Sequence, residues 1–122
     1  MEDKLVSLET AKLAKKKEFN EICQYYYEIL DKPITLQRMS CSNAEGYKQP
    51  TAPTQSLLAK WLRERYNIYI NIIYCSWGQF SYSLYDTKLM EEIVWFSGEE
   101  NNFDTYEEAL EFGLRNALKL IK

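Results

Sequence analysis

The chain has 122 residues, of which 46% are hydrophobic and 27% charged, and its formal net charge at pH 7 is −3. A chain of this length forms one domain that buries about two-thirds of its unfolded surface, so folding needs neither a disulfide nor a metal. Histidine is absent, which excludes Ser-His and Cys-His nucleophile pairs and all zinc sites that use histidine. Three cysteines cannot supply a four-cysteine zinc site either. We therefore predict no metal and no cofactor.

The cysteines, Cys23, Cys41 and Cys75, are far apart and odd in number. This pattern argues against a disulfide framework and favours a reducing compartment. The acidic N-terminus lacks the apolar segment of a secretion signal, and no apolar run reaches the roughly 20 residues of a membrane helix. We expect a cytoplasmic protein that makes no membrane contact.

Charge is divided unevenly along the chain. Residues 1–66 carry 11 basic and 9 acidic side chains, whereas residues 67–122 carry 4 basic and 9 acidic ones. The densest basic group is Lys12, Lys15, Lys16 and Lys17. Nucleic-acid-binding domains usually show a broader basic surface, so this distribution does not favour nucleic acid as the partner.

The N-terminal region predicts one clear helix, which Ser7 can cap and which continues to about Lys17. Residues 19–30 fit either a second short helix or an extended edge segment, because the triplet Tyr25, Tyr26 and Tyr27 has strand propensity.

Residues 31–53 form the least regular part of the chain, since Pro33, Gly46, Pro50 and Pro53 interrupt it. Residues 34–39 are a candidate for a short strand within it. Too little chain precedes this segment for an independent core. We therefore predict a single domain, 1–122, in which residues 1–53 pack on a core of residues 54–122.

That core is predicted to begin with a helix at residues 54–66. Its apolar side chains form one broad stripe: Leu57, Leu58, Trp61, Leu62 and Tyr66. Such a stripe indicates a helix that faces the core.

Three strands are expected after this helix. Residues 67–75 are apolar on both faces, which is typical of a central strand. Residues 80–85 alternate large apolar side chains with Ser81 and Ser83, which we expect to face water. Residues 93–96 form the third strand, and Gly78 suits the hairpin turn between the first two.

The last twenty residues predict an amphipathic helix at 105–121. Thr105 and Glu108 fit the capping box Ser/Thr-x-x-Glu, with Asp104 as the rival cap. The order of elements in residues 54–121 is thus α-β-β-β-α. We predict an α+β fold in which a three-stranded antiparallel sheet is covered by two helices, with an N-terminal helical and irregular extension.

Aromatic residues are concentrated in the predicted sheet, where residues 66–96 hold nine of the chain's eighteen. Helices cover one side of such a sheet, so several of these side chains should face outward and bind a partner. The residues that we assign to this partner-binding surface are Tyr69, Trp77, Tyr85 and Phe96. Ordinary packing of aromatic residues in strands is the alternative.

No motif in the chain predicts an active site. Adjacent carboxylates such as Glu107 and Glu108 point in different directions on a helix, so they do not form an acid–base pair. Four isolated glycines cannot build a phosphate-binding loop. We predict that the chain is not an enzyme, with small carboxylate- or tyrosine-based catalysis as the remaining enzymatic alternative.

The helix–strand–strand–strand–helix order from Thr54 to Ile121 is similar to that of the double-stranded RNA-binding domain. That family contacts phosphate with a lysine cluster at the start of its last helix. This chain has Thr105, Tyr106, Glu107 and Glu108 there, which would repel RNA. The resemblance implies a shared topology and leaves a nucleic-acid-binding module as an alternative function.

A second resemblance spans nearly the whole chain. Residues 7–14, 53–64 and 103–111 resemble segments of a small uncharacterised family from Bacteroides-type genomes, often found in phage-derived or mobile regions. This resemblance implies a cytoplasmic, non-enzymatic accessory protein and supplies no site residues. Together with the outward aromatic residues, it leads us to expect an interaction protein that binds a protein partner or itself.

Overall fold

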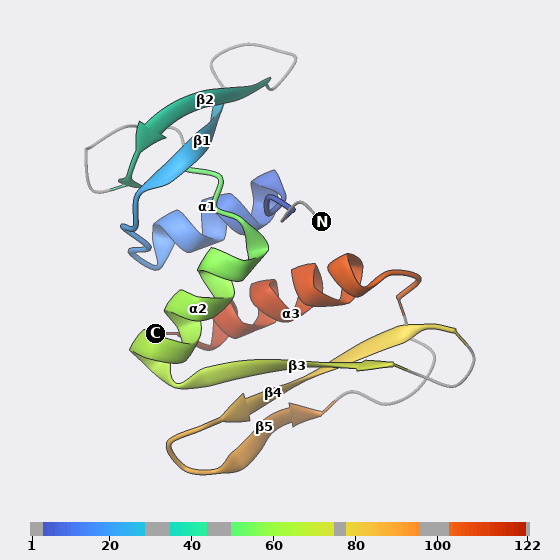
Figure 1. Cartoon of the computed structure of the whole chain (residues 1–122). Helices are drawn as coiled ribbons and strands as arrows, with labels where there is room; N and C mark the ends of the chain where they lie inside the picture. The colour runs from blue at the N-terminus through green and yellow to red at the C-terminus, as the bar shows by residue number, and fades with distance from the viewer. Residues whose placement is uncertain (1–3, 29–34, 44–49, 75–77, 96–102, 122) are drawn as a thin grey trace. The chain divides into compact units, whose positions relative to one another are not determined.

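The computed structural model describes residues 4–28, 35–43, 50–74, 78–95 and 103–121, which contain three helices and five strands. These elements confirm an α+β fold (Figure 1). The chain divides into two compact units, Met1–Thr54 with Lys122, and Gln55–Ile121. The packing of residues 1–53 on the core stays a prediction.

The first unit contains the predicted N-terminal helix, α1 (Leu8–Lys16). Ser7 caps it, because its Oγ accepts a hydrogen bond from the backbone N–H of Thr10 at 3.4 Å. Ala11 and Ala14 are buried, whereas Lys12 and Lys16 are exposed. The helix therefore has the narrow apolar stripe and solvated lysines that its sequence indicates.

A two-stranded antiparallel sheet follows, formed by β1 (Cys23–Glu28) and β2 (Thr35–Cys41). Of the two alternatives for residues 19–30, the extended segment is therefore correct at residues 23–28, although β1 is paired on both sides and does not lie at an edge. The candidate strand at residues 34–39 of the irregular segment is confirmed, and it continues to Cys41 as β2.

The other edge of β1 is paired with residues 50–52, although this stretch begins with Pro50 and is followed by Pro53. The carbonyl of Pro50 accepts from the N–H of Tyr27 at 3.0 Å, and the N–H of Ala52 donates to the carbonyl of Tyr25 at 2.8 Å. Proline lacks an N–H but keeps its carbonyl acceptor, so it can take part at such an edge.

The second unit contains α2 (Gln55–Tyr66), β3 (Ile68–Tyr74), β4 (Phe80–Asp86), β5 (Glu91–Trp95) and α3 (Tyr106–Leu120). The strands are antiparallel in the order β3-β4-β5. Figure 1 shows α2 and α3 on the same side of these strands. We call this side the inner face and the opposite side the outer face.

The inner face is closely packed against α3. An added Cβ at Gly113 would lie 2.7 Å from Cγ2 of Ile70 and 3.4 Å from the ring of Tyr82, so only glycine lets the helix approach this near. Leu84 and Leu114 are fully buried.

Thr105 caps α3, since its Oγ1 accepts a hydrogen bond from the backbone N–H of Glu108 at 3.1 Å. The capping prediction is confirmed, with Thr105 and not Asp104 as the N-cap.

Two predictions about the strands are wrong. Residues 67–75 were expected to be a central strand, but within the described part of the chain β3 lies at the edge and β4 is in the middle. Ser81 and Ser83 were expected to face water, but each is only 5% exposed. The middle position of β4 explains this burial, because small side chains there are sheltered by larger ones on neighbouring strands; Ile73 is the partner of Ser81 on β3.

Candidate functional site

The outer face of the β3–β4 pair carries two of the predicted partner-binding residues. Tyr69 and Tyr85 are direct partners across the antiparallel register, so their side chains lie next to each other on the same face. Tyr69 is 44% exposed, and Tyr85 is half-buried. The structure thus brings these two residues together, as the prediction of a common surface requires.

The turn between β4 and β5 extends this surface. One carboxylate oxygen of Asp86 accepts hydrogen bonds from the N–H groups of Lys88 at 2.9 Å and Leu89 at 3.0 Å. The hydroxyl of Tyr85 donates to the carbonyl of Met90 at 2.7 Å. Met90 has a φ of 58°, in the left-handed region that non-glycine residues rarely adopt. These hydrogen bonds hold the turn in one conformation.

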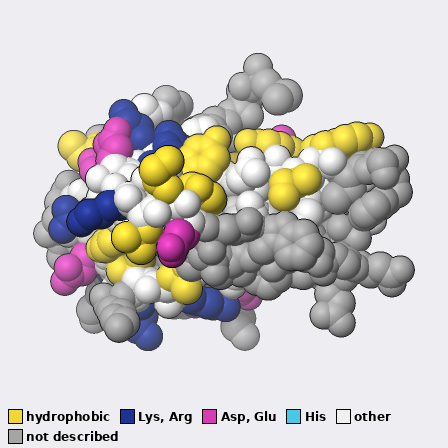
Figure 2. Space-filling model, turned by 90° about the horizontal axis from the view of Figure 1, so that it is seen from below, with side chains coloured by type: hydrophobic (Ala, Val, Ile, Leu, Met, Phe, Trp, Pro, Cys, Tyr) yellow, Lys and Arg dark blue, Asp and Glu magenta, His cyan; other side chains and the backbone are white. Residues whose placement is uncertain are grey.

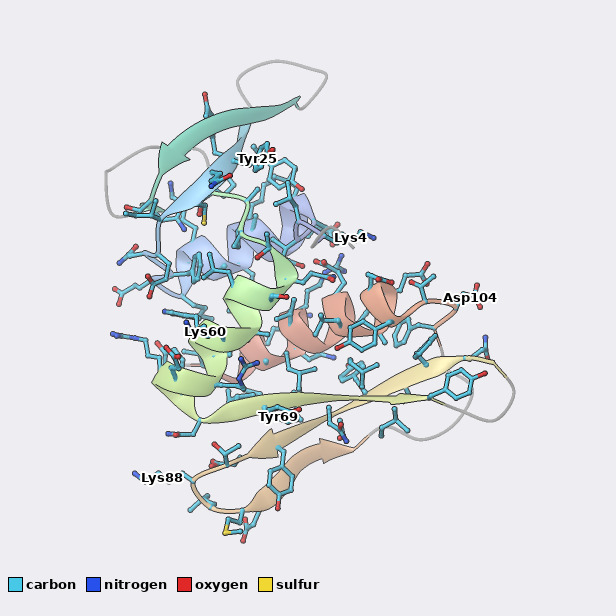
Figure 3. All side chains as sticks on the ribbon, in the orientation of Figure 1. Lys4, Tyr25, Lys60, Tyr69, Lys88 and Asp104 are labelled. Carbon is cyan, nitrogen blue, oxygen red and sulfur yellow. The ribbon has the colours of Figure 1, made fainter. Side chains whose placement is uncertain are left out.

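The ordered turn presents two large apolar side chains to solvent. Leu89 is 64% exposed and Met90 is 75% exposed. Tyr85 joins them to Tyr69, because it pairs with Tyr69 and bonds to the turn. We call Tyr69, Tyr85, Leu89 and Met90 the outer-face patch. Figure 3 shows Tyr69 and Lys88 toward the same end of the strands, and Figure 2 shows hydrophobic side chains reaching the surface when the molecule is seen from below.

Trp77 and Phe96 lie outside the described residues. Their assignment to the partner-binding surface stays a prediction. Leu89 and Met90 were not predicted as site residues, because they lie between the strands predicted at 80–85 and 93–96, where the sequence shows no motif. An Asp followed by adjacent large apolar residues in a short turn is the signal that could have identified them.

A second group of aromatic residues, also missed by the sequence analysis, lies where α3 begins. The ring centroids of Tyr74 and Phe80 are 5.3 Å apart, and those of Phe80 and Tyr106 are 6.3 Å apart, both in edge-to-face geometry. Phe103 stacks at 4.8 Å on Phe112. Tyr74 is 66% exposed. Aromatic pairs of this kind stabilise local structure.

Backbone pairing explains why these rings meet. The N–H of Phe80 donates to the carbonyl of Phe103, and the N–H of Phe103 donates to the carbonyl of Phe80, both at 2.7 Å. Gln79 also donates a side-chain hydrogen bond to Asp104 at 3.3 Å. The segment before α3 is thereby attached to the start of β4. This group closes the hairpin end of the second unit, which is a structural role.

Three titratable groups stand out by their burial: Tyr82, Lys15 and Glu111. Burial raises the pKa of the Tyr82 hydroxyl, although a hydrogen bond from Asn116 acts in the opposite direction. Burial also lowers the pKa of Lys15. Glu111 is 9% exposed and accepts a hydrogen bond from Nε2 of Gln55 at 3.1 Å. Lys15 belongs to the first unit, and within the second unit Tyr82 and Glu111 lie on different elements, β4 and α3.

A nucleic-acid-binding function requires the basic residues to gather on one face. Lys12, Lys15, Lys16 and Lys17 belong to the first unit, whereas Arg63 and Arg65 belong to the second. The gathering of these basic residues on one face therefore stays a prediction.

Among the residues the structure describes, no group of three or more His, Cys, Asp or Glu could hold a metal ion. In the same residues, no helix is long and apolar enough to cross a membrane.

The chain matches no protein-family model, and comparison with curated proteins and with solved structures gave no significant match.

Proposed function

We propose that this chain is a non-enzymatic interaction protein that binds a protein partner through the outer-face patch. The observation that carries the proposal is the turn at residues 86–90, which is held by hydrogen bonds while exposing Leu89 and Met90 by 64% and 75%. Large apolar side chains cost free energy in water, and a fixed turn loses little conformational entropy when a partner covers it.

The composition of the patch suits protein recognition. Tyrosine and methionine are enriched at protein interfaces, and methionine adapts its shape to different partners. The exposed side chains of Lys88 and Glu91 border the patch and supply a polar rim. An apolar centre with a polar rim is the usual arrangement of a protein-binding surface.

Charge makes nucleic acid the weaker alternative. The first turn of α3 contains Glu107 and Glu108, which a phosphate backbone would repel. The helix dipole stabilises both carboxylates at this place, which gives them a role within the fold. We therefore favour a protein as the partner.

The expected setting is cytoplasmic. The odd number of separated cysteines and the resemblance to accessory proteins of phage-derived or mobile regions support it. A protein of this kind acts by occupying the surface of another protein rather than by chemistry.

A photo-crosslinking amino acid at position 89 tests the proposal in cells that express the chain naturally. We expect a specific crosslinked protein at this position, and loss of that product when Tyr69→Ala is added. Ile22, which is 68% exposed in the first unit, is the matched control position. No product at position 89, or the same product at both positions, would contradict the proposal.

A further inference from the structure

Strand β3 has the composition of a central strand but lies at an edge of its sheet. Its seven residues, IYINIIY, include no charge, no proline and no glycine. Strands paired on both sides typically have apolar residues on both faces. Among the residues that the structure describes, however, β3 pairs only with β4.

The direction of the unpaired backbone groups follows from two observations. Phe80 uses both its N–H and its carbonyl to bond Phe103, so it does not bond its β3 partner Tyr74. The N–H of Thr87 donates to the carbonyl of Asn67, so Asn67 does face β4. Because hydrogen-bonding directions alternate along a strand, every second residue of β3 points its N–H and carbonyl away from β4. These residues are Ile68, Ile70, Ile72 and Tyr74.

The other outer strand of this sheet carries features that prevent pairing. The register of β5 with β4 is interrupted between Leu84 and Tyr85, and β5 begins with the exposed Glu91. Charges and irregularities of this kind protect edges from association, whereas β3 pairs with β4 in continuous register and has neither.

The pattern of β3 is suited to pairing with itself. A two-fold symmetric interface requires a surface that is complementary to its own copy. An uncharged strand meets this requirement without like-charge repulsion. Centred on Asn71, β3 reads almost the same in both directions, with isoleucine on each side and a tyrosine toward each end.

We propose that β3 pairs antiparallel with β3 of a second copy of this chain, joining the two sheets into one continuous six-stranded sheet. Asn71 faces Asn71 of the partner subunit on the two-fold axis. In this register the outward-pointing groups of both strands face each other, which produces the following pairs: Ile68 with Tyr74 of the partner subunit, Tyr69 with Ile73 of the partner subunit, and Ile70 with Ile72 of the partner subunit.

Side-chain exposure fits this arrangement. Ile70 and Ile72 are only half-buried, and Tyr74 is 66% exposed at the end of the strand. Pairing covers all three with apolar partners, which stabilises antiparallel strands. Asn71 is exposed, and its amide can hydrogen-bond the same amide of the partner subunit on the outer face. An asparagine at the axis favours this register, because a shift by two residues leaves it opposite Tyr69 of the partner subunit or Ile73 of the partner subunit, neither of which returns the amide hydrogen bond.

The first test uses the unmodified chain and measures amide hydrogen exchange by NMR, one residue at a time. In a lone edge strand, the N–H groups of Ile70, Ile72 and Tyr74 exchange rapidly, whereas those of Tyr69, Asn71 and Ile73 are protected by β4. In the proposed dimer, all six are protected, and light scattering gives twice the 14.5 kDa of the chain. Rapid exchange of the first three, or a monomer throughout a dilution series, would overturn the proposal.

The second test changes the charge on the axis. Asn71→Lys places two like charges opposite each other, and so does Asn71→Asp; we expect each variant to dimerise about tenfold or more weakly. Mixing the two variants restores a dimer, since Lys then faces Asp. Leu89→Lys adds the same charge at an exposed turn of the same sheet and should leave the dimer intact.

Circular dichroism and thermal unfolding confirm that each variant is folded. A dimer that tolerates both charged variants, or a mixture that stays monomeric, would show that the axis does not lie at Asn71. Tyr69 belongs to both surfaces, and Leu89→Lys separates them because it changes the outer-face patch without touching β3. Loss of partner binding with an intact dimer would leave this inference standing.

Discussion

The two faces of the β3–β4 pair have similar residues but different surroundings. On the inner face, Ile68 is 7% exposed, Tyr82 2% and Leu84 fully buried, and α3 approaches closely at Gly113. On the outer face, Tyr69 is 44% exposed next to the open turn at Leu89 and Met90. Tyrosine and aliphatic side chains therefore stabilise the fold on one face and are available to a partner on the other.

This difference separates stability from binding. A buried side chain contributes to folding through the area that it removes from water and through its contacts. An exposed side chain contributes little until a partner covers it. Substitutions on the inner face should thus lower the free energy of unfolding, whereas substitutions on the outer face should lower affinity for a partner.

The largest effect on stability is expected for Leu84→Ala. Leu84 is 0% exposed on the middle strand and pairs with Ile70. Removing its side chain leaves a cavity in the inner core, and we expect the free energy of unfolding to fall by about 2–5 kcal/mol in urea titrations. Tyr69→Ala is the matched outer-face variant and should cost about 1 kcal/mol or less. Equal losses for both variants would contradict the distinction between the faces.

A smaller loss is expected for Gly113→Ala. The added methyl group would lie 2.7 Å from Cγ2 of Ile70, and such overpacking costs about 1–3 kcal/mol. Alanine favours a helix over glycine by about 1 kcal/mol, which offsets part of this cost. We therefore expect a net decrease in the midpoint of thermal unfolding.

The control for this prediction is the same substitution in an Ile70→Leu background. Leucine keeps the volume of isoleucine but lacks the Cγ2 methyl group. If the close approach is the cause, the two substitutions couple, and Gly113→Ala costs less in this background. An unchanged cost would mean that the inner face does not restrict this position.

The sequence predicts the helices better than the arrangement of the strands. The stripe from Leu57 to Tyr66 places α2 at residues 55–66, and the Thr105–Glu108 spacing places the start of α3. Both signals are local, because helix periodicity and caps depend on residues a few positions apart. The edge position of β3 depends on which strand β4 bonds on its other side, and no local pattern contains that information.

The candidate site shows the same limit. Alternation along the strands assigns Tyr69 and Tyr85 to one face, and the register confirms that they are neighbours. Leu89 and Met90 become exposed because Asp86 and Tyr85 hold the turn, which depends on hydrogen bonds that the sequence does not specify. The burial of Ser83 likewise depends on the strands on either side of β4.

The next prediction concerns the helix that covers the inner face. Thr105→Ala removes the acceptor for the N–H of Glu108, and we expect a loss of about 1 kcal/mol in the free energy of unfolding. Asp104→Ala leaves this cap in place and should cost less. Thr105→Ser keeps the hydroxyl and should restore most of the stability. A larger loss for Asp104→Ala than for Thr105→Ala would show that Asp104 is the effective cap.

The smallest expected effect is a pH dependence that comes from Tyr82. Burial raises the pKa of its hydroxyl above the ordinary value of 10.0, so folding favours the neutral phenol. Its contribution to stability is complete below pH 10.0 and is lost as the pH rises through the raised pKa, since the folded state then holds more protons than the unfolded state. We expect the free energy of unfolding of the unmodified chain to fall more steeply in this alkaline range than that of Tyr82→Phe. Parallel curves would mean that the inner face does not keep Tyr82 from water, which would weaken the contrast between the two faces.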